Sequence, residues 1–409
     1  MKTVGIVAEY NPLHNGHQYH IQKSKELSQG DFVIAVMSGN YVQRGEPAIL
    51  DKWHRTRMAL LNGVDMVIEL PVLFSCASAE FFASAAVKLL QDTSLVNYIC
   101  FGSEIGDVQT LKQAADFFAN EPEDFQLMLK QFLDEGLSYP TARMKAFESL
   151  SGFSSTILSN PNNILGIEYL KALSRLASPM LPITVERQGA GYHSSNTNTS
   201  FASATALRKA LFHQQWEEVT AHVPSSCLDI LQQAFSNGQA PISMDDFVSC
   251  LQYRMRMTPL HHLAEIFEVS EGLEHRILRL ASCGSSIEEM ISAIKTKRYT
   301  YTKVQRILLH ILLDISSQQV MSLHQQPHLP YIRVLGFRRS KEILLKQLIK
   351  SANVPVITNL KNAEEKLSTE GISLLQLEEK ATDIYFMASP NPSFRKLGQE
   401  RTTPMVMIP

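Results

Sequence analysis

The sequence predicts an α/β protein in which a mainly parallel sheet, covered by helices on both faces, is followed by a mainly helical region. In about the first two hundred residues, short apolar runs rich in Val and Ile alternate with helical patterns and recur roughly every thirty residues, the length of a β-α-β unit. Continuous apolar strands separated by helices are typical of a parallel sheet that is buried on both faces. Beyond residue 201, helical periodicity dominates.

Five apolar runs are the candidate strands of the sheet, and they span residues 4–8, 32–37, 66–70, 96–101 and 182–187. Helical patterns between them cover residues 18–27, 53–61, 77–90 and 164–176. Later helices are predicted at 204–212, 216–223, 244–256, 260–267, 273–282, 287–294, 302–315 and 340–351, with a strand-like piece at 354–358 and a last apolar segment at 382–387. Loop signals at 224–226 and 236–238 follow the proposed boundary, so we expect one domain at 1–212 and a second at 213–409.

The composition excludes several classes of protein. A chain of 409 residues with 44% hydrophobic residues suits two or three globular domains. The 38 Lys and Arg balance 40 Asp and Glu, so a nucleic-acid surface has to be a local patch. The five cysteines form no Cys-x-x-Cys pair, which argues against a structural zinc site and against a disulfide-linked partner. No leader and no run near the roughly 20 apolar residues of a membrane span is visible, so we expect a cytoplasmic protein without a membrane partner.

The segment from Gly5 to His17 predicts a strand, a sharp turn at Asn11-Pro12 and a helix start. Ligands of open parallel sheets bind beyond the carboxyl ends of the strands, and the first turn of a helix offers unpaired N–H groups to a phosphate. Gly16 lets a phosphate approach the backbone closely. His14 and His17 are three residues apart and can face the same side, where two imidazole donors would meet negative charge as it builds at an α-phosphorus.

Two further segments can complete a nucleotide site. The turn Phe101-Gly102-Ser103-Glu104 follows the fourth predicted strand, where Gly102 lets a base or ribose lie against the backbone. In the segment 201–208, Ser203 is a predicted N-cap, and Thr205 and Arg208 share a helix face that suits β- and γ-phosphates. Taken alone, the segment 101–104 is better interpreted as an ordinary turn at a strand end. Taken alone, the segment 201–208 is equally compatible with a capped helix that carries an exposed arginine. Together with the first motif, both segments favour a nucleotide site.

The glycine-bounded loop Ser38-Gly39-Asn40-Tyr41-Val42-Gln43-Arg44-Gly45-Glu46-Pro47 follows the second predicted strand. A small second substrate binds at such a place in an open sheet. Asn40 and Arg44 of this loop, and Lys52 on the next helix, are therefore candidate ligands of that substrate. Other cations on the same helix are expected to face solvent.

The strand–Pro-x-His-x-Gly-His pattern resembles the signature of the nucleotidyltransferase superfamily, whose catalytic domain is Rossmann-like. The segments 5–17, 37–47, 52–57, 101–104 and 159–166 closely resemble one family, the bacterial tRNA(Met) cytidine acetate ligases. This resemblance implies that ATP activates acetate as acetyl-adenylate, with release of pyrophosphate. The acetyl group is then transferred to N4 of the wobble cytidine of elongator tRNA(Met). Mg²⁺ is expected to enter with ATP, held chiefly by phosphates and water, so no protein ligand for a metal is predicted.

The resemblance and the motifs together define a candidate site. His14, His17 and Arg208 are the expected catalytic residues. The expected ATP contacts are Val7, Ala8, Glu9, Tyr10, Asn11, Pro12, Leu13, His14, Asn15, Gly16, His17, Gln18, Tyr19, His20, Gly102, Asn162, Arg187, Gln188, Ser203 and Thr205. Acetate is expected near Asn40, Arg44 and Lys52.

Two basic segments are candidates for contact with tRNA. The stretch 295–306 contains five cations and two tyrosines, which suit phosphates and unpaired bases. The stretch 336–341 is a second basic patch at a predicted helix start. The expected tRNA contacts are Lys297, Arg298, Tyr299, Tyr301, Arg338 and Arg339, although basic helix faces that only meet solvent are equally common.

Two other functions compete with the ligase. One is an adenylyltransferase that acts on a small phosphorylated metabolite, but such enzymes are usually far shorter than this chain. The other is a non-catalytic protein that binds tRNA or a nucleotide, against which the intact His14 and His17 speak.

Overall fold

The fold is built around an eight-stranded sheet. The computed structural model describes residues 1–154, 156–187, 202–280 and 284–409. The strand order is β10-β8-β5-β2-β1-β6-β7, with β9 paired to β8. The strands are β1 (Thr3–Ala8), β2 (Phe32–Ser38), β5 (Met66–Leu70), β6 (Tyr98–Ser103), β7 (Leu181–Glu186), β8 (Ile332–Arg338), β9 (Val356–Ile357) and β10 (Val406–Ile408).

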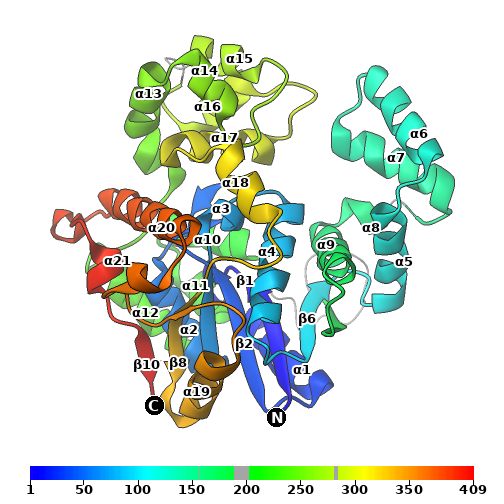
Figure 1. The fold of residues 1–409 in the computed structure, drawn as a ribbon. Coiled ribbons are helices and arrows are strands. Elements are labelled where there is room, and N and C mark those ends of the chain that lie inside the picture. Colours follow the sequence, from blue (N-terminus) through cyan, green and yellow to red (C-terminus); the bar gives the residue numbers. More distant parts are fainter. Residues whose placement is uncertain (155, 188–201, 281–283) are drawn as a thin grey trace.

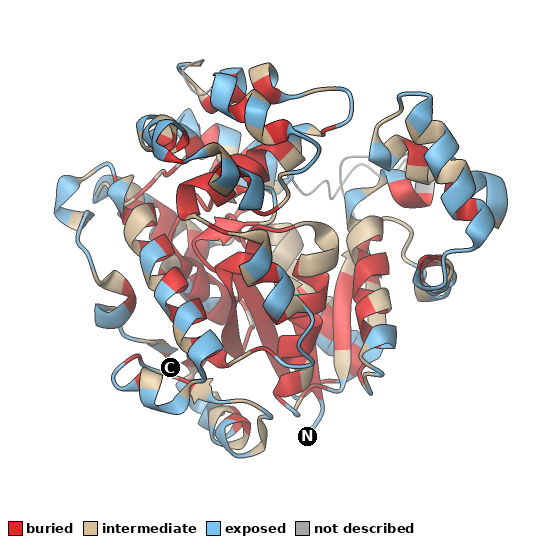
Figure 2. Cartoon of the chain, turned by 45° about the horizontal axis from the view of Figure 1, so that its top comes forward, coloured by how far each residue is buried: buried red, intermediate tan, exposed pale blue. Residues whose placement is uncertain are grey.

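All five predicted strands are confirmed, and β1, β2, β5, β6 and β7 run parallel to their neighbours among these five. Both sheet faces are covered, and for this reason β2 is apolar throughout. Val33, Ala35 and Met37 belong to one core cluster, whereas Ile34 and Val36 belong to the other. Figure 2 shows the resulting buried sheet between two layers of helices.

One face of the sheet packs against α1 (Asn15–Ser28), α2 (Lys52–Leu61), α10 (Ala204–Phe212), α11 (Trp216–His222) and α12 (Ser225–Ser236). The other face packs against α4 (Ala79–Asp92), α5 (Val108–Ala119), α9 (Pro161–Arg175), α19 (Glu342–Ser351) and α20 (Thr369–Met387). The smaller elements are α3 (Val72–Ser75), the hairpin β3 (Tyr41–Val42) and β4 (Glu46–Pro47), α21 (Gln399–Thr402), and the 3₁₀ turns η2 (Arg339–Lys341), η3 (Ala363–Lys366) and η4 (Pro392–Phe394).

The sheet extends beyond residue 212, where we placed the end of the first domain. β8 and β10 come from the second half of the chain, and β8 pairs antiparallel with β5 through Met66 and Phe337. The sequence did not indicate β8, because its two arginines and Gly336 interrupt the apolar pattern. A Cβ at Gly336 would lie 2.6 Å from the carbonyl oxygen of Val406, so this glycine admits β10. The apolar segment 382–387 belongs to helix α20.

A helical unit lies over the carboxyl ends of the central strands, at the top of Figure 1. It consists of η1 (Met244–Phe247), α13 (Val248–Met257), α14 (Leu260–Glu265), α15 (Leu273–Leu280), α16 (Ile287–Ile294), α17 (Tyr301–Leu313) and α18 (Ser317–His324). His310 of α17 contacts the carbonyl oxygens of Phe267 and Cys76 at 3.1 and 3.0 Å, which ties the unit to α3.

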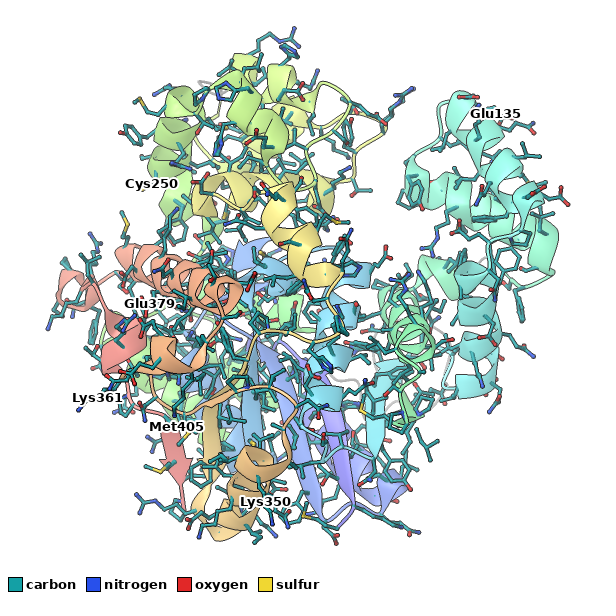
Figure 3. All side chains as sticks on the ribbon, viewed as in Figure 1. Glu135, Cys250, Lys350, Lys361, Glu379 and Met405 are labelled. Carbon is teal, nitrogen blue, oxygen red and sulfur yellow. The ribbon has the colours of Figure 1, made fainter. Side chains whose placement is uncertain are left out.

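A second projection, inserted between β6 and β7, contains α6 (Glu123–Asp134), α7 (Tyr139–Ser151) and α8 (Thr156–Ser159). Glu135 marks its upper end in Figure 3. Within the described part of the chain, no helix is long and apolar enough to cross a membrane.

Candidate active site

The candidate site lies at the edge of the sheet where β1, β2, β5, β6 and β7 end, which we call the carboxyl edge. Strand β1 ends at Ala8, and the chain turns through Tyr10, whose φ of 49° lies in the left-handed region. Helix α1 starts at Asn15, so the positive end of its backbone dipole lies at this edge. The strand–turn–helix arrangement predicted for 5–17 is confirmed.

His14 and His17 form a reciprocal cap on α1. The backbone N–H of Gly16 donates to Nδ1 of His14 at 3.1 Å, and the N–H of His14 donates to Nδ1 of His17 at 3.3 Å. The two rings are stacked with centroids 3.8 Å apart. Because each Nδ1 uses its lone pair as an acceptor, the ring proton of a neutral imidazole has to be on Nε2. The cap therefore determines the tautomer of both rings.

Burial keeps these imidazoles neutral. Desolvation, together with the charges of Arg187 and His222, lowers the pKa of His14 to about 4. The pKa of His17 lies well below its ordinary value, chiefly because of burial and then because of His14. At neutral pH both rings are therefore uncharged Nε2–H donors. Such donors suit an oxygen on which negative charge develops.

Helix α10 brings a guanidinium to the same turn. Ser203 caps α10 by accepting the N–H of Ala206 at 3.2 Å, as predicted. Arg208 donates through Nη1 to the carbonyl oxygen of Asn11 at 3.0 Å and through Nη2 to Oε1 of Glu46 at 2.8 Å. Its Nη2 also lies 3.4 Å from Oγ1 of Thr205. The structure thus brings Arg208 and Thr205 to the turn that holds the histidines.

A second group of polar residues joins β6, β7 and α9. Glu104 accepts the Nδ2–H of Asn162 at 2.6 Å and the N–H of Asn163 at 2.9 Å. Arg187 donates to Oδ1 of Asn162 at 3.4 Å. A Cβ at Gly102 would lie 3.3 Å from Cγ of Arg187, so the glycine lets this side chain pass close to the backbone. Gly102, Asn162 and Arg187 therefore lie together, whereas Gln188 lies outside the described residues.

The turn itself contains donors that suit a nucleotide. Nδ2 of Asn11, Oη of Tyr10 and Nε2 of His20 are buried and have no hydrogen-bond partner among the described residues. Burial, and then Arg187, lowers the pKa of His20 to about 4. Unpaired buried donors carry a desolvation cost that a bound anion can offset. The residue types present at the carboxyl edge therefore fit a polyphosphate.

Of the three residues proposed to bind acetate, only Arg44 is exposed. Lys52 is fully buried, and its Nζ lies 2.6 Å from both Glu69 and Glu400. Asn40 is buried as well, donating to Thr382 at 3.2 Å and accepting the N–H of Lys52 at 2.9 Å. Because these polar groups are already paired inside the protein, we correct the expectation and assign Asn40 and Lys52 a structural role.

A signal for this cluster was present in the sequence. Glu69 interrupts the apolar strand Met-Val-Ile-Glu-Leu, and a carboxylate at a buried strand position requires a cation. The cation and the second carboxylate come from α2 and α21, which only the fold brings together.

The expected tRNA contacts fall into two groups. Lys297, Arg298 and Tyr301 are exposed. Tyr299 is buried, and its hydroxyl donates to Ser270 and Glu271, so it is not available for stacking on a base.

Arg338 and Arg339 lie at the opposite edge of the sheet. The N–H of Arg338 donates to the carbonyl oxygen of Asp65, just before β5 begins, and β5 runs from there toward the carboxyl edge. Lys350 of the adjoining helix α19 is labelled at this lower end in Figure 3. This position separates Arg338 and Arg339 from the carboxyl edge, because β8 runs antiparallel to β5.

Two hollows of the surface lie away from the site. One, of about 620 Å³, is at the opposite sheet edge and is lined by Lys2, Asn97 and Leu181 among others. Another, of about 380 Å³, lies between α13, α17 and α20, with Tyr253, Leu312 and Met387 in its wall. Neither contains the donors of the carboxyl edge.

Known proteins match this chain over its whole length. A family model described as HIGH Nucleotidyl Transferase matches residues 1–400. The tRNA(Met) cytidine acetate ligase of Acetivibrio thermocellus is 43% identical over 415 residues, covering 100% of both chains. The enzyme of the same name from Caldanaerobacter subterraneus is 43% identical, covering 97% of this chain and 98% of its own. Among solved structures, Thermotoga maritima TmcAL bound with alpha-thio ATP has a TM-score of 0.92 at 32% identity, covering 100% of both chains.

Proposed function

Because the chain belongs to the tRNA(Met) cytidine acetate ligase family of HIGH nucleotidyl transferases, we propose that it activates acetate with ATP and transfers the acetyl group to N4 of the wobble cytidine of elongator tRNA(Met). The observation that carries this proposal is the pair of neutral Nε2–H donors, His14 and His17, at the start of α1. They stand where a helix N-terminus and a guanidinium also favour negative charge.

The first step is attack of an acetate oxygen on the α-phosphorus of ATP. The new P–O bond forms as the bond to the pyrophosphate breaks, so the step needs positioning and charge neutralisation and no protein nucleophile. His14 and His17 donate to the α-phosphate oxygens, while Arg208 and Thr205 bind the pyrophosphate. Gly102, Asn162 and Arg187 hold the nucleoside end of ATP. The ATP analogue bound to the Thermotoga maritima protein supports a nucleotide at this fold.

Mg²⁺ enters with the triphosphate in this proposal. Across the described residues, no group of three His, Cys, Asp or Glu side chains could hold a metal ion. Phosphate oxygens and water suit Mg²⁺, which keeps several waters in such sites. No residue of this chain is assigned to it.

The second step is attack of the cytidine N4 on the acyl carbon of acetyl-adenylate. A C–N bond forms, the acyl C–O bond breaks, AMP leaves and one amine proton is released. We place the tRNA along the exposed residues Lys297, Arg298 and Tyr301. They lie just before and at the start of α17, which belongs to the helical unit at the top of Figure 1. Helix α17 packs on the β3–β4 hairpin through Arg306 and Gly45.

One assay separates this function from its alternatives. The protein is incubated with ATP, labelled acetate and unmodified elongator tRNA(Met), and the RNA is digested to nucleosides. We expect label in N4-acetylcytidine, with AMP and pyrophosphate as products. Label that reaches RNA only from acetyl-CoA, or AMP that remains on a small product, would contradict the proposal. Binding of ATP and tRNA without either product would identify a non-catalytic protein.

Replacing Lys297 and Arg298 with alanine should weaken tRNA binding and lower the salt dependence. Each lost phosphate contact reduces the slope of log K against log salt by about 0.7 to 0.9. Acetate-dependent ATP–pyrophosphate exchange should be unchanged, since Lys297 and Arg298 are not among the residues expected to bind ATP or acetate. Arg339→Ala is the control, because Arg339 is also exposed but lies at the opposite edge. Equal loss of tRNA binding in both variants would refute the placement.

A further inference from the structure

The acetyl-transfer step requires a group that accepts the proton of the cytidine amine. Neither His14 nor His17 can do so in its resting form, because Nδ1 holds a backbone N–H and Nε2 carries the ring proton. The carboxylates of Glu46 and Glu104 are also engaged, by Arg208 at 2.8 Å and by Asn162 at 2.6 Å. The base therefore has to be another residue.

We propose that Glu9 is the general base of acetyl transfer, an inference that rests on the function proposed above. Glu9 directly follows the last residue of β1, at the carboxyl edge and one residue before the turn. Oε1 accepts the N–H of Gln43 at 2.8 Å, and Gln43 is itself anchored to the carbonyl oxygen of Ala77 at 3.2 Å. Oε2 accepts no hydrogen bond from a described residue, and the side chain is half-buried. One oxygen is thus held in place while the other remains able to take a proton.

The order of the strands puts Glu9 on the side away from the nucleoside. Gly102 lies in β6 and Arg187 follows β7, and both strands are on one side of β1. Gln43 and Arg44 follow β2, which is on the other side of β1. Glu9 is bonded to the β2 side. Among the described residues, His20 and His222 are further histidines near the turn. His20 interacts with Arg187, and His222 interacts with His14, so both histidines lie toward the nucleotide.

Burial and the neighbouring charges together raise the pKa of Glu9 above its ordinary value, which makes its carboxylate a stronger base. Burial raises the pKa of Glu9; the N–H of Gln43 opposes this, Glu46 raises the pKa further, and Arg208 and Arg44 lower it. The ionisable groups that face it come from four neighbouring elements: Arg44 and Glu46 of the hairpin, Arg208 of α10, Arg55 of α2 and Tyr169 of α9. Efficient general bases have pKa values close to the working pH.

The proposed step balances without any further reactant. The lone pair of N4 forms the C–N bond, and the electron pair of the acyl C–O bond leaves with AMP. The amine proton passes to Oε2 of Glu9 and from there to water. Adenylation needs no base, because acetate is already an anion and no proton is transferred in that step.

Glu9→Gln separates the two steps. The glutamine amide oxygen still accepts the N–H of Gln43 but cannot take a proton. Because Glu9 lies in the segment expected to contact ATP, acetate-dependent ATP–pyrophosphate exchange measures any loss of ATP binding in the variant. Single-turnover transfer from preformed acetyl-adenylate to tRNA should fall about 100-fold or more beyond that loss. The transfer rate of the unmodified enzyme should rise with pH and level off above the pKa of Glu9, and the variant should lack this rise. Glu9→Asp, which keeps a carboxylate but moves it, should recover part of the rate.

Glu168→Gln is the matched control, because Glu168 is a buried carboxylate of α9 that pairs with Lys171 at 2.8 Å away from the site. Transfer at the normal rate by Glu9→Gln overturns the inference. Parallel loss of exchange and transfer also overturns it, since Glu9 would then serve ATP binding. Failure of the unmodified protein to acetylate tRNA would instead refute the proposed function.

Discussion

Replacing His14 with asparagine should lower acetate-dependent ATP–pyrophosphate exchange by about 100- to 1000-fold while the fold persists. The lost Nε2–H donor corresponds to about 2.7–4 kcal/mol of transition-state stabilisation, the range found when one oxyanion donor is removed. Asparagine is a favoured N-cap residue, so its side-chain oxygen can still accept the N–H that Nδ1 accepts now. The variant therefore removes the donor and keeps the cap.

His14→Ala provides the comparison, because it removes both the cap and the donor. It should lose exchange to the same extent as His14→Asn. In addition, its free energy of unfolding should be lower by the ~1 kcal/mol typical of an N-cap, so that it unfolds at a lower temperature. His17→Asn should behave like His14→Asn. Exchange close to normal in either asparagine variant would remove that histidine from the mechanism.

The pH dependence of exchange offers an independent check on these rings. Because the folded-state pKa of His14 is lowered to about 4, its neutral form stabilises the fold above pH 6.5, and this contribution is lost as the pH falls toward 4. The His14 ring is also neutral throughout this range above pH 4, so the rate of exchange should not change with the titration of an imidazole near pH 6.5. A rise in rate through pH 6.5 that disappears in His14→Asn would contradict a neutral donor.

Lys52→Met should destabilise the protein by about 3–5 kcal/mol, the cost of removing one partner from a buried ion pair. Lys52 is the cation between Glu69 and Glu400, and the three side chains are buried. Burial alone would lower the pKa of Lys52, but the surrounding carboxylates raise it above its ordinary value. The measurement is the urea midpoint at constant m-value. Lys23→Met, which breaks an exposed pair with Glu26, should leave the midpoint unchanged.

The deficit of Lys52→Met should shrink in acid. Burial raises the folded-state pKa of Glu69 and of Glu378. The stability contribution of a carboxyl with a raised pKa is present at low pH and is lost as the pH rises through that pKa. Without Lys52 this loss of stability is larger. The free energy of unfolding of the variant should therefore approach that of the unmodified protein as the pH falls. Adding Glu69→Gln to Lys52→Met should raise the urea midpoint again at neutral pH. If the midpoint recovers neither in acid nor with Glu69→Gln, the buried carboxylates are not the cause of the destabilisation.

Much of the catalytic half was predictable, since its signals are local. The five strands and the helix starting near His14 follow from runs of a few residues, and the structure places them as predicted. The strand β8 was not predictable in this way. Its arginines and Gly336 are explained only by the neighbours β5 and β10, from distant parts of the chain.

The residues of the site differ in the same way: those with local signals were predictable, and those with distant partners were not. His14-Asn15-Gly16-His17 could be interpreted from the sequence because a strand, a turn and a helix start are consecutive in the chain, so their geometry follows from local backbone preferences. The role of Lys52 could not be interpreted from the sequence. A lysine that binds a substrate and a lysine inside an ion-pair cluster cannot be distinguished until the fold brings Glu400 beside it.

The sequence by itself thus determined the local geometry, which is a helix start with two imidazoles that suits a phosphate. Only the tertiary structure decided which polar groups remain free for substrates. It paired Lys52, Tyr299 and Glu46 with distant partners and left one oxygen of Glu9 without any among the described residues. The physical reason is that the state of a buried polar group depends on its desolvation and on its partners, and both arise from contacts between segments far apart in the chain.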